Sequence, residues 1–503
     1  MHSYLRVAIL AFLILVAFAT TARFFRVAYY HLKAPHDICF ESHNLASIKS
    51  IQAGANIYDK GFYGDWPFII TIYNPLFHYI VASLPQSNSN PFFVGRLISL
   101  ISTILIAMLL FLPSDIKGNL KYAIIFLISF FLMRLTVRYA AYLRSDTLGV
   151  FFSGAAIVLL DRVYPKKVLL AAVAFLCFLA FLSKQSFIAA SVTCCLFLIM
   201  KDKGAGIFFA TILASIYTIF AVFATVYWGE GYWFSAYVAV IKTPASALLT
   251  LSHWKHMLGD PILVLLCIVT LFSISYAIHR NQFQFLRDSP YPLYLLFSFL
   301  SCAFSGAKLG SSENGFLEVV LALLLWNVYF TGRWVKEIRK GLLTNAILIL
   351  FLFLAAMELV FANPNAYSFA DAKTIAFREN AYSITKREIE QLNPPNDHFV
   401  SLNCLVTLYK VQSGAYLNDP FNYWMMWTHG ILDVAPFVKA IQMERFSLIL
   451  IVDAEKNPYG IPSMPSFPPG SAFDRIGHAI SEHYSMRKRG VFIYLAPLNK
   501  RHF

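Results

Sequence analysis

Apolar stretches close to the length of a membrane-spanning helix recur along residues 1–361, and short polar connections separate them. A helix needs about 20 largely apolar residues to cross the hydrocarbon core of a bilayer. The pattern predicts about eleven such helices, although two of the stretches are short. They are expected near 7–28, 92–112, 121–137, 147–161, 167–183, 186–201, 206–227, 260–278, 290–306, 315–331 and 342–361.

The polar connections differ in their content of Lys and Arg. Short cytoplasmic loops of membrane proteins collect these residues. One alternate set of connections holds Arg6, Lys117, Lys121, Arg162, Lys166, Lys167, Lys201, Lys203, Arg280, Arg287, Arg333, Lys336, Arg339 and Lys340. These connections are predicted to be cytoplasmic. The other set therefore faces outward, and it comprises 31–91, 228–259, 307–314 and the tail from about 362.

The first apolar stretch allows two interpretations. Arg6, an apolar run and the small residues Ala19-Thr20-Thr21-Ala22 loosely fit a cleaved signal peptide. Apolar character continues through Phe24, Phe25, Val27 and Tyr29, so the run is longer than the apolar part of most signal peptides. We therefore favour an uncleaved first span.

The tail from 362 to 503 changes character. Short strand-like runs lie at 399–402, 447–452 and 491–495, and helical patterns lie at 404–413, 421–444 and 472–488. Alternation of strands and helices is typical of a small α/β domain. The expected fold is a polytopic α-helical membrane module over 1–361, followed by an extracytoplasmic α/β domain over 362–503.

Composition supports the membrane assignment and excludes one class of partner. Of the 503 residues, 58% are hydrophobic and 14% are charged, whereas soluble domains are about 25% charged. The net charge of +14 is the excess expected of basic cytoplasmic loops. The chain has no basic soluble module with interleaved aromatic residues, so nucleic acid is not an expected partner.

The outer loop 31–91 opens with two carboxylates, Asp37 and Glu41. On a helix, residues four apart share one face. Such a pair can act as a general base and as a second carboxylate that binds metal or orients an acceptor. The alternative is a solvated segment in which Asp37 caps a helix.

Aromatic and amide side chains follow in the same loop. Gly54 is expected to cap the helix that begins near His43. Tyr58, Tyr73 and Asn74 come next. Aromatic residues at this depth form the belt of a membrane interface, and stacking on a sugar is the alternative.

Three cations lie at the predicted outer ends of helices. The planar fork of Arg144 suits a phosphate, or it pairs locally with Asp146. Lys184 interrupts two apolar runs, and it either contacts a phosphate or extends to the interface. Lys308 lies in a Gly- and Ser-containing turn whose backbone N–H groups can bind an anion, and an ordinary polar turn is the alternative.

The turn at 306–315 also carries Glu313 and Asn314, and Glu318 enters the next predicted span. A carboxylate inside a membrane is costly unless it is paired. Glu318 is therefore expected to be paired or to face a cavity. His253 and His256 could bind a metal, but spacing places no third ligand beside them, so a solvated loop is the simpler interpretation.

An ordered set of short motifs covers nearly the whole chain. The set comprises Asp37 and Glu41, Gly54-x-x-Ile57-Tyr58, Tyr73-Asn74-Pro75-Leu76, Gly95-Arg96-Leu97-Ile98-Ser99, Arg144-Ser145-Asp146, Lys184, Lys308-Leu309-Gly310-Ser311-Ser312-Glu313-Asn314, Leu317-Glu318 and Asp419-Pro420-Phe421. It resembles the GT-C class of membrane glycosyltransferases. Within that class it resembles the bacterial protein O-mannosyltransferase-like and aminoarabinose-transferase-like superfamily.

The resemblance implies transfer of a sugar from a polyprenyl-phosphate donor to a hydroxyl of a lipid, glycan or protein acceptor. The reaction would take place on the extracytoplasmic side of a bacterial inner or plasma membrane, with inversion of the anomeric centre. It implies catalysis by Asp37 and Glu41 and phosphate binding by Arg144, Lys184 and Lys308. The residues expected to bind substrate are Tyr58, Tyr73, Asn74, Glu313, Asn314 and Glu318.

Several points stay open at this stage. Many relatives carry adjacent Asp-Glu in the first loop, whereas here three residues separate Asp37 from Glu41. Either carboxylate is therefore a candidate base, and we favour Asp37. The resemblance is compatible with a divalent metal, with no ligand set defined. A non-enzymatic lipid or polysaccharide transporter or flippase, and a lipid-linked oligosaccharide ligase or polymerase, are the alternative functions.

Overall fold

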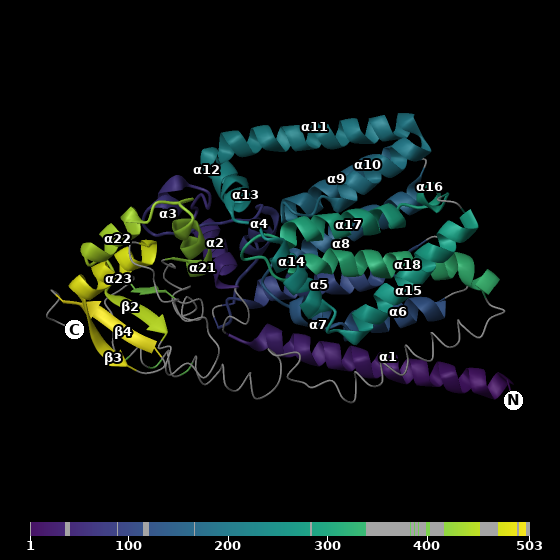
Figure 1. The fold of residues 1–503 in the computed structure, drawn as a ribbon, viewed down its shortest axis with the longest axis horizontal. Coiled ribbons are helices and arrows are strands. Elements are labelled where there is room, and N and C mark those ends of the chain that lie inside the picture. Colours follow the sequence, from purple (N-terminus) through teal and green to yellow (C-terminus); the bar gives the residue numbers. More distant parts are fainter. Residues whose placement is uncertain are drawn as a thin grey trace.

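The computed structural model describes residues 2–35, 41–87, 89–113, 120–164, 166–281, 284–338, 399–402, 417–452, 471–489 and 492–498, with three single positions at 383, 387 and 391. Long helices dominate this part of the chain and lie along the long axis of the molecule (Figure 1). They are α1 (His2–Lys33), α5 (Phe93–Leu109), α6 (Leu120–Leu132), α8 (Asp146–Val163), α9 (Lys167–Ser183), α10 (Ala189–Lys201), α11 (Lys203–Tyr227), α15 (Pro261–Asn281), α17 (Tyr291–Gly306) and α18 (Phe316–Ile338).

Every predicted span falls on one of these helices except 342–361, which lies outside the described residues. Four segments are long and apolar enough to cross a membrane, namely Ala11–Lys33, Lys203–Tyr227, Pro261–Arg280 and Glu313–Arg333. The last is 83% buried inside the protein, and Lys203–Tyr227 is 17% buried. Thus α18 forms the centre of the bundle, and α11 offers an apolar outer surface that suits lipid (Figure 1).

The predicted span 121–137 is not one helix, because it breaks at Met133 between α6 and α7 (Arg134–Tyr139). The break frees the backbone N–H of Arg134, which donates to the Asp260 carboxylate at 2.8 Å. The same carboxylate accepts from the N–H groups of Ile262 and Leu263 at the start of α15. Asp260 therefore joins the start of one helix to the break in another.

Short elements gather at the end of the bundle nearest the C-terminal sheet (Figure 1). They include α2 (Ser42–Gln52), α3 (Lys60–Gly64), α4 (Leu76–Ala82), α12 (Glu230–Trp233), η2 (Phe234–Val238), α13 (Ala239–Lys242), α14 (Ala247–Met257) and η3 (Glu313–Gly315). Gly54 follows α2 with φ of 78°. This left-handed conformation favours glycine and confirms the predicted cap. Another short helix, α16 (Phe285–Asp288), precedes α17.

The described residues of the tail, here called the C-terminal module, build a four-stranded sheet in the order β1-β2-β4-β3. The strands are β1 (Phe399–Ser401), β2 (Leu448–Val452), β3 (Tyr484–Arg489) and β4 (Phe492–Pro497). Strands β1 and β2 are parallel, and the other pairs are antiparallel. The helices are α21 (Pro420–Thr428), α22 (Ala435–Gln442) and α23 (Ala472–His483).

Two helices predicted in the tail are corrected by the structure. The helix expected over 472–488 ends at His483, because residues 484–489 pair with β4 as a strand. The helix expected over 421–444 is divided into α21 and α22, with Gly430 at φ of 63° in the turn between them. The helix expected over 404–413 lies outside the described residues.

The C-terminal module packs directly on the outer loop. Tyr63, Phe68 and Ile70 share one apolar core with residues of α21, α22 and β2. The Asn418 side chain accepts from the N–H of Ile70 and donates to its carbonyl, both at 2.9 Å. The Tyr423 hydroxyl donates to the carbonyl of Tyr63 at 2.9 Å. The module therefore holds the loop that carries the predicted catalytic acids.

Candidate functional site

The structure describes only one of the two predicted acids. Asp37 lies outside the described residues. Glu41 is fully buried and receives two hydrogen bonds from the guanidinium of Arg96, at 2.9 and 2.5 Å. The backbone N–H of Leu143 donates to the same carboxylate at 2.6 Å. Arg96 also donates to the carbonyls of His31 and Ala34, so the pair joins the end of α1 to α5 and to the segment before α8.

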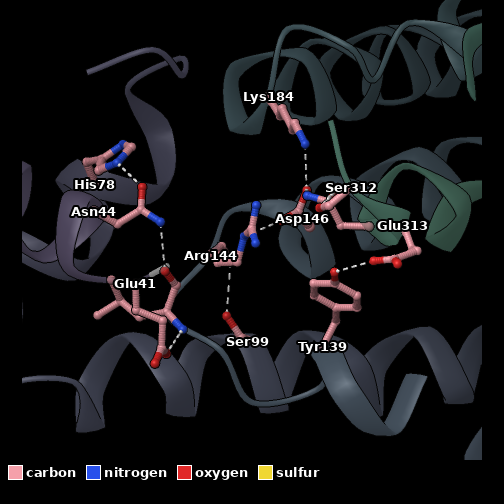
Figure 2. A network of polar contacts seen from close by, with 12 residues as sticks. Glu41, Asn44, His78, Ser99, Tyr139, Arg144, Asp146, Lys184, Ser312 and Glu313 are labelled. Carbon is pink, nitrogen blue, oxygen red and sulfur yellow. Dashed lines mark hydrogen bonds and ion pairs between the residues drawn. The ribbon is translucent and has the colours of Figure 1, made fainter. Parts of the chain in front are cut away.

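A neutral contact lies beside this pair. The amide of Asn44 donates to the carbonyl of Leu143 at 2.8 Å, and Nε2 of His78 contacts the other end of that amide at 3.0 Å (Figure 2). Burial lowers the pKa of His78 to about 3. An imidazole with that pKa is uncharged at neutral pH, so this contact fixes α2 and α4 without a charge.

Asp146, the first residue of α8, lies at the centre of a polar cluster (Figure 2). Its carboxylate contacts Nζ of Lys184 at 2.8 Å and Nε of Arg144 at 3.2 Å. It also accepts a hydrogen bond from Asn314 at 2.9 Å. The Asp146 side chain is 4% exposed, whereas Arg144 and Lys184 are 10% and 15% exposed. The two cations are therefore more open than the carboxylate that holds them together.

The local backbone explains why these side chains meet. Asp146 is the first residue of α8, and Arg144 lies directly before that helix. Lys184 follows the last residue of α9 with an extended backbone. The helices α8 and α9 are antiparallel neighbours joined at their other ends by a short connection, so the start of one lies beside the end of the other. Both cations thus meet the same carboxylate at this end of the bundle.

Glu313 forms a second acidic centre next to this cluster. Its carboxylate contacts the Tyr139 hydroxyl at 3.4 Å, Arg138 at 3.5 Å and Nδ1 of His256 at 2.9 Å. Ser312 donates to the amide oxygen of Asn314 at 2.8 Å, which orients the Asn314 amide N–H towards Asp146. The turn at 312–314 therefore joins the two acidic centres.

Lys308 is not brought into the Asp146 cluster. Its ammonium donates to the carbonyls of Ile241 at 2.8 Å and Thr243 at 3.2 Å, at the end of α13. The backbone of Leu309 adds a hydrogen bond to Pro244 in the same connection. Lys308 thus fastens the 306–315 turn to the segment after α13.

Two of the three predicted substrate residues in the outer loop are buried and already bonded. The Tyr58 hydroxyl donates to the carbonyl of Tyr73 at 2.6 Å. The Asn74 amide donates to Phe181 at 2.7 Å and accepts from the Tyr232 hydroxyl at 2.8 Å. Tyr73 is only partly buried, and its ring centroid lies 5.3 Å from Nζ of Lys184. Of these three residues, Tyr73 is the one that borders the Asp146 cluster.

Glu318 lies within the bundle. Its carboxylate accepts hydrogen bonds from Ser153 of α8 and from Tyr294 of α17, the latter at 3.3 Å. The expectation that this carboxylate is paired is therefore confirmed. It connects three packed helices.

Solved structures of two membrane enzymes share this architecture. ArnT from Cupriavidus metallidurans bound to undecaprenyl phosphate aligns with a TM-score of 0.62 at 10% identity, over 96% of this chain and 98% of that chain. Its apo state gives 0.57 at 11% identity, over 95% and 97%. The chain has the GT-C fold.

A more distant example of the GT-C fold also aligns. The oligosaccharyltransferase AglB from Archaeoglobus fulgidus, in complex with an inhibitory peptide and a dolichol-phosphate, gives a TM-score of 0.54 at 11% identity, over 99% of this chain and 75% of that chain. No protein-family model and no curated protein sequence matches the chain. Its likeness to GT-C proteins is therefore one of three-dimensional arrangement.

Within this GT-C fold, sequence reasoning missed two residues of the site. Asp146 was considered only as a local partner of Arg144, because its contacts with Lys184 and Asn314 span 38 and 168 positions. His43 was noted only as the start of a helix, and its ring centroid lies 6.0 Å from that of Tyr73. Nothing in its sequence neighbourhood marks it. Among the residues that the structure describes, no three His, Cys, Asp or Glu side chains are arranged to hold a metal ion.

Proposed function

We propose that the chain is a membrane glycosyltransferase that moves a sugar from a polyprenyl-phosphate carrier to an acceptor hydroxyl. The observation that carries the proposal is the placement of Arg144 and Lys184 on one carboxylate at the end of the helical bundle. In support, the chain shares its fold with ArnT, which was solved bound to undecaprenyl phosphate. The proposal includes about eleven spans, with residues 362–503 as an extracytoplasmic domain.

Arg144 and Lys184 are assigned to the phosphate of the donor. A sugar joined to a polyprenyl phosphate carries one negative charge on the phosphodiester, and the leaving phosphate gains a second. Preorganised cations that meet a developing charge in a site with little water lower the barrier to its formation. Asp146 keeps the two cations in place before the donor arrives, so less ordering is needed on binding.

Asp37 is assigned as the general base and Glu41 as a structural anchor. The acceptor hydroxyl gives its proton to the Asp37 carboxylate, and the hydroxyl oxygen attacks the anomeric carbon. The bond from that carbon to the phosphate oxygen breaks, and its electron pair stays on the phosphate. Attack from the opposite side inverts the anomeric centre. Glu41 is unsuited to the proton transfer because its carboxylate is committed to Arg96 and Leu143.

Tyr73, Glu313 and Asn314 are retained as residues that border the substrate. Tyr58, Asn74 and Glu318 are assigned structural roles, because their polar atoms are bonded inside the protein. Lys308 is assigned to the rim of the site, where its charge acts from a distance.

The test is an assay of the purified chain in lipid nanodiscs with undecaprenyl-phosphate sugars labelled in the sugar. Transfer or hydrolysis releases bare undecaprenyl phosphate, whereas a transporter leaves the sugar–phosphate bond intact. Asp37→Asn should abolish release while the protein stays folded. The matched control is Asp59→Asn, which changes an exposed acid of the same loop that caps α3. Full turnover by Asp37→Asn would overturn the assignment of the base.

A further inference from the structure

His43 lies in the first turn of α2, between the Asp146 cluster and the C-terminal module. Its carbonyl accepts hydrogen bonds from Ser47 at 3.1 Å and from the side chain of Asn418 at 3.5 Å. One partner belongs to α2 and the other to the C-terminal module, so the backbone of His43 is fixed from two directions. The fold therefore fixes the backbone position from which the imidazole projects.

The imidazole of His43 has an unused hydrogen-bonding atom. Its Nε2 is buried and has no hydrogen-bond partner among the residues that the structure describes. By comparison, the buried ring of His78 bonds Asn44 through Nε2 at 3.0 Å, and its Nδ1 has no partner among the described residues. Buried polar atoms in folded proteins are nearly always paired. An unpaired one at the edge of a polar cluster marks a place that a group from a ligand can complete.

Tyr73 connects this atom to the proposed phosphate site. The Lys184 ammonium lies 5.3 Å from the centroid of the Tyr73 ring, and the His43 ring centroid lies 6.0 Å from the same ring. A six-membered sugar is about as wide as an aromatic ring. Both groups lie within 6.0 Å of the centroid of that ring, so a sugar that packs on Tyr73 with its phosphate at Lys184 would lie within reach of His43. Small-molecule sites commonly combine such an aromatic surface with a few placed polar groups.

We propose that His43 binds a hydroxyl group of the transferred sugar through Nε2. This inference rests on the proposed function and assigns its sugar subsite to the His43 and Tyr73 side chains. His43 then distinguishes a donor that carries a hydroxylated sugar from bare polyprenyl phosphate, while Arg144 and Lys184 bind the phosphate that both share.

Burial favours a neutral imidazole at His43, although most of the charged groups around it favour the protonated form. Burial lowers the pKa of His43, and the nearby carboxylate of Asp419 opposes that shift. Arg144 also lowers the pKa, whereas Asp146 and Glu41 raise it, with a net decrease. A neutral imidazole has one nitrogen that donates and one that accepts. A sugar hydroxyl can serve either one, so the contact does not require a particular tautomer.

The experiment compares binding of two probes to the chain in nanodiscs. The first is bare undecaprenyl phosphate. The second is a sugar probe, for which undecaprenyl-phosphate glucose and undecaprenyl-phosphate mannose are each used. The wild type should bind at least one sugar probe more tightly than the bare phosphate. His43→Ala should lose roughly tenfold in affinity for that sugar probe, the effect of one hydrogen bond to a ligand. Its affinity for bare undecaprenyl phosphate should stay the same.

Two further variants separate binding from folding. His43→Gln keeps a polar group near the position of Nε2 and should recover part of the lost affinity for the sugar probe. His429→Gln is the matched control, because His429 is an exposed histidine at the end of α21, and it should bind both probes as the wild type does. If His43→Ala misfolds, His43→Gln is compared with the wild type in its place. It should show a smaller loss of affinity, and only for the sugar probe.

The outcomes that contradict the inference differ from those that contradict the proposed function. Equal weakening of both probes, or no weakening of either, overturns the role of His43. A wild type that binds bare undecaprenyl phosphate but gains nothing from either sugar overturns this sugar subsite and leaves the phosphate site in place. A wild type that binds no probe at all overturns the proposed function, and the sugar subsite with it.

Discussion

Two arginine–carboxylate pairs lie in the same part of the molecule, and they differ in what surrounds the carboxylate. Glu41 and Arg96 are both 0% exposed, and their contact has two hydrogen bonds. Asp146 is shared between Arg144 and Lys184, both of which keep some exposure. The Glu41–Arg96 pair is fully buried. In the Asp146 cluster, by contrast, one carboxylate holds two cations that keep some exposure.

We interpret this difference as that between a structural anchor and the proposed phosphate site. A buried ion pair is tolerated only when good geometry and extra hydrogen bonds compensate for lost hydration. Arg96 and Glu41 meet that condition through the backbone groups of His31, Ala34 and Leu143. Asp146 holds two cations that keep a small exposure, which is the arrangement expected if they bind the phosphate of the proposed donor. The number and exposure of the cations thus say more about function than the presence of an acid does.

The largest effect on stability is expected from breaking the Glu41–Arg96 pair. Arg96→Met leaves the Glu41 carboxylate buried without its main partner, which should destabilise the protein by about 3–5 kcal/mol. Thermal unfolding in detergent measures this loss. Arg287→Met, which changes an exposed arginine of α16, is the control and should change stability by at most about 1 kcal/mol. A wild-type unfolding temperature for Arg96→Met would contradict the role of anchor.

Removing a cation from the Asp146 cluster should lower activity and leave the stability of the protein nearly unchanged. Lys184→Met removes one cation while Asp146 keeps Arg144 and Asn314. Transfer should fall about 10²–10³-fold, the usual loss when one preorganised charge-stabilising group is removed. Rates with labelled donor, together with the unfolding temperature, test this. A variant that loses stability in proportion to activity would show that the cluster is a second anchor.

A smaller effect is expected at Lys308. Its ammonium is bonded to two carbonyls away from Asp146, so Lys308→Met should lower transfer by less than Lys184→Met does, by roughly a fewfold change of the kind caused by exposed charges. Parallel assays of the two methionine variants at low and high salt provide the measurement. A loss as large as that of Lys184→Met would place Lys308 in direct contact with the phosphate.

The contact between His78 and Asn44 is a third case, because it carries no charge at neutral pH. A change of pH near neutrality should therefore leave its contribution to stability unchanged. Because the folded pKa of about 3 lies below the unfolded value near 6.5, the unfolded chain binds more protons between these values. The contribution of His78 to the free energy of unfolding should therefore be constant above about pH 6.5 and decrease as pH falls from 6.5 towards 3. His78→Gln should reduce that acid dependence. Unfolding temperatures from pH 7.5 to pH 4.5, compared with those of the wild type, measure it.

The helices of the bundle could be predicted from the sequence, because a bilayer requires long apolar stretches whatever their neighbours. The break at Met133 could not, since residues 121–137 are largely apolar and contain no proline or glycine, and the N–H that the break frees is bonded by Asp260 far along the chain. Strand β3 was also missed. Its sequence from Tyr484 to Arg489 ends in three polar residues and has no apolar run, and its pairing with β4 decides its conformation.

The sequence marked candidate site residues where the chemistry was local and missed contacts that depend on distant partners. Arg144 and Lys184 were predicted because a cation at a helix end is unusual in an apolar chain. The sequence could not distinguish Glu41 from a catalytic acid, because its partner Arg96 lies 55 positions away. The unpaired nitrogen of His43 is visible only when its surroundings are known.

The contact between Asn418 and Ile70 has a consequence for how such a chain can change over time. The amide of Asn418 pairs with the N–H and the carbonyl of Ile70 and makes no use of the isoleucine side chain for these bonds. Apolar residues other than proline that fill the same place in the shared core at position 70 therefore leave both hydrogen bonds available. The loop and the module can diverge in sequence while they remain docked, which is one physical route to a shared architecture at 10% identity.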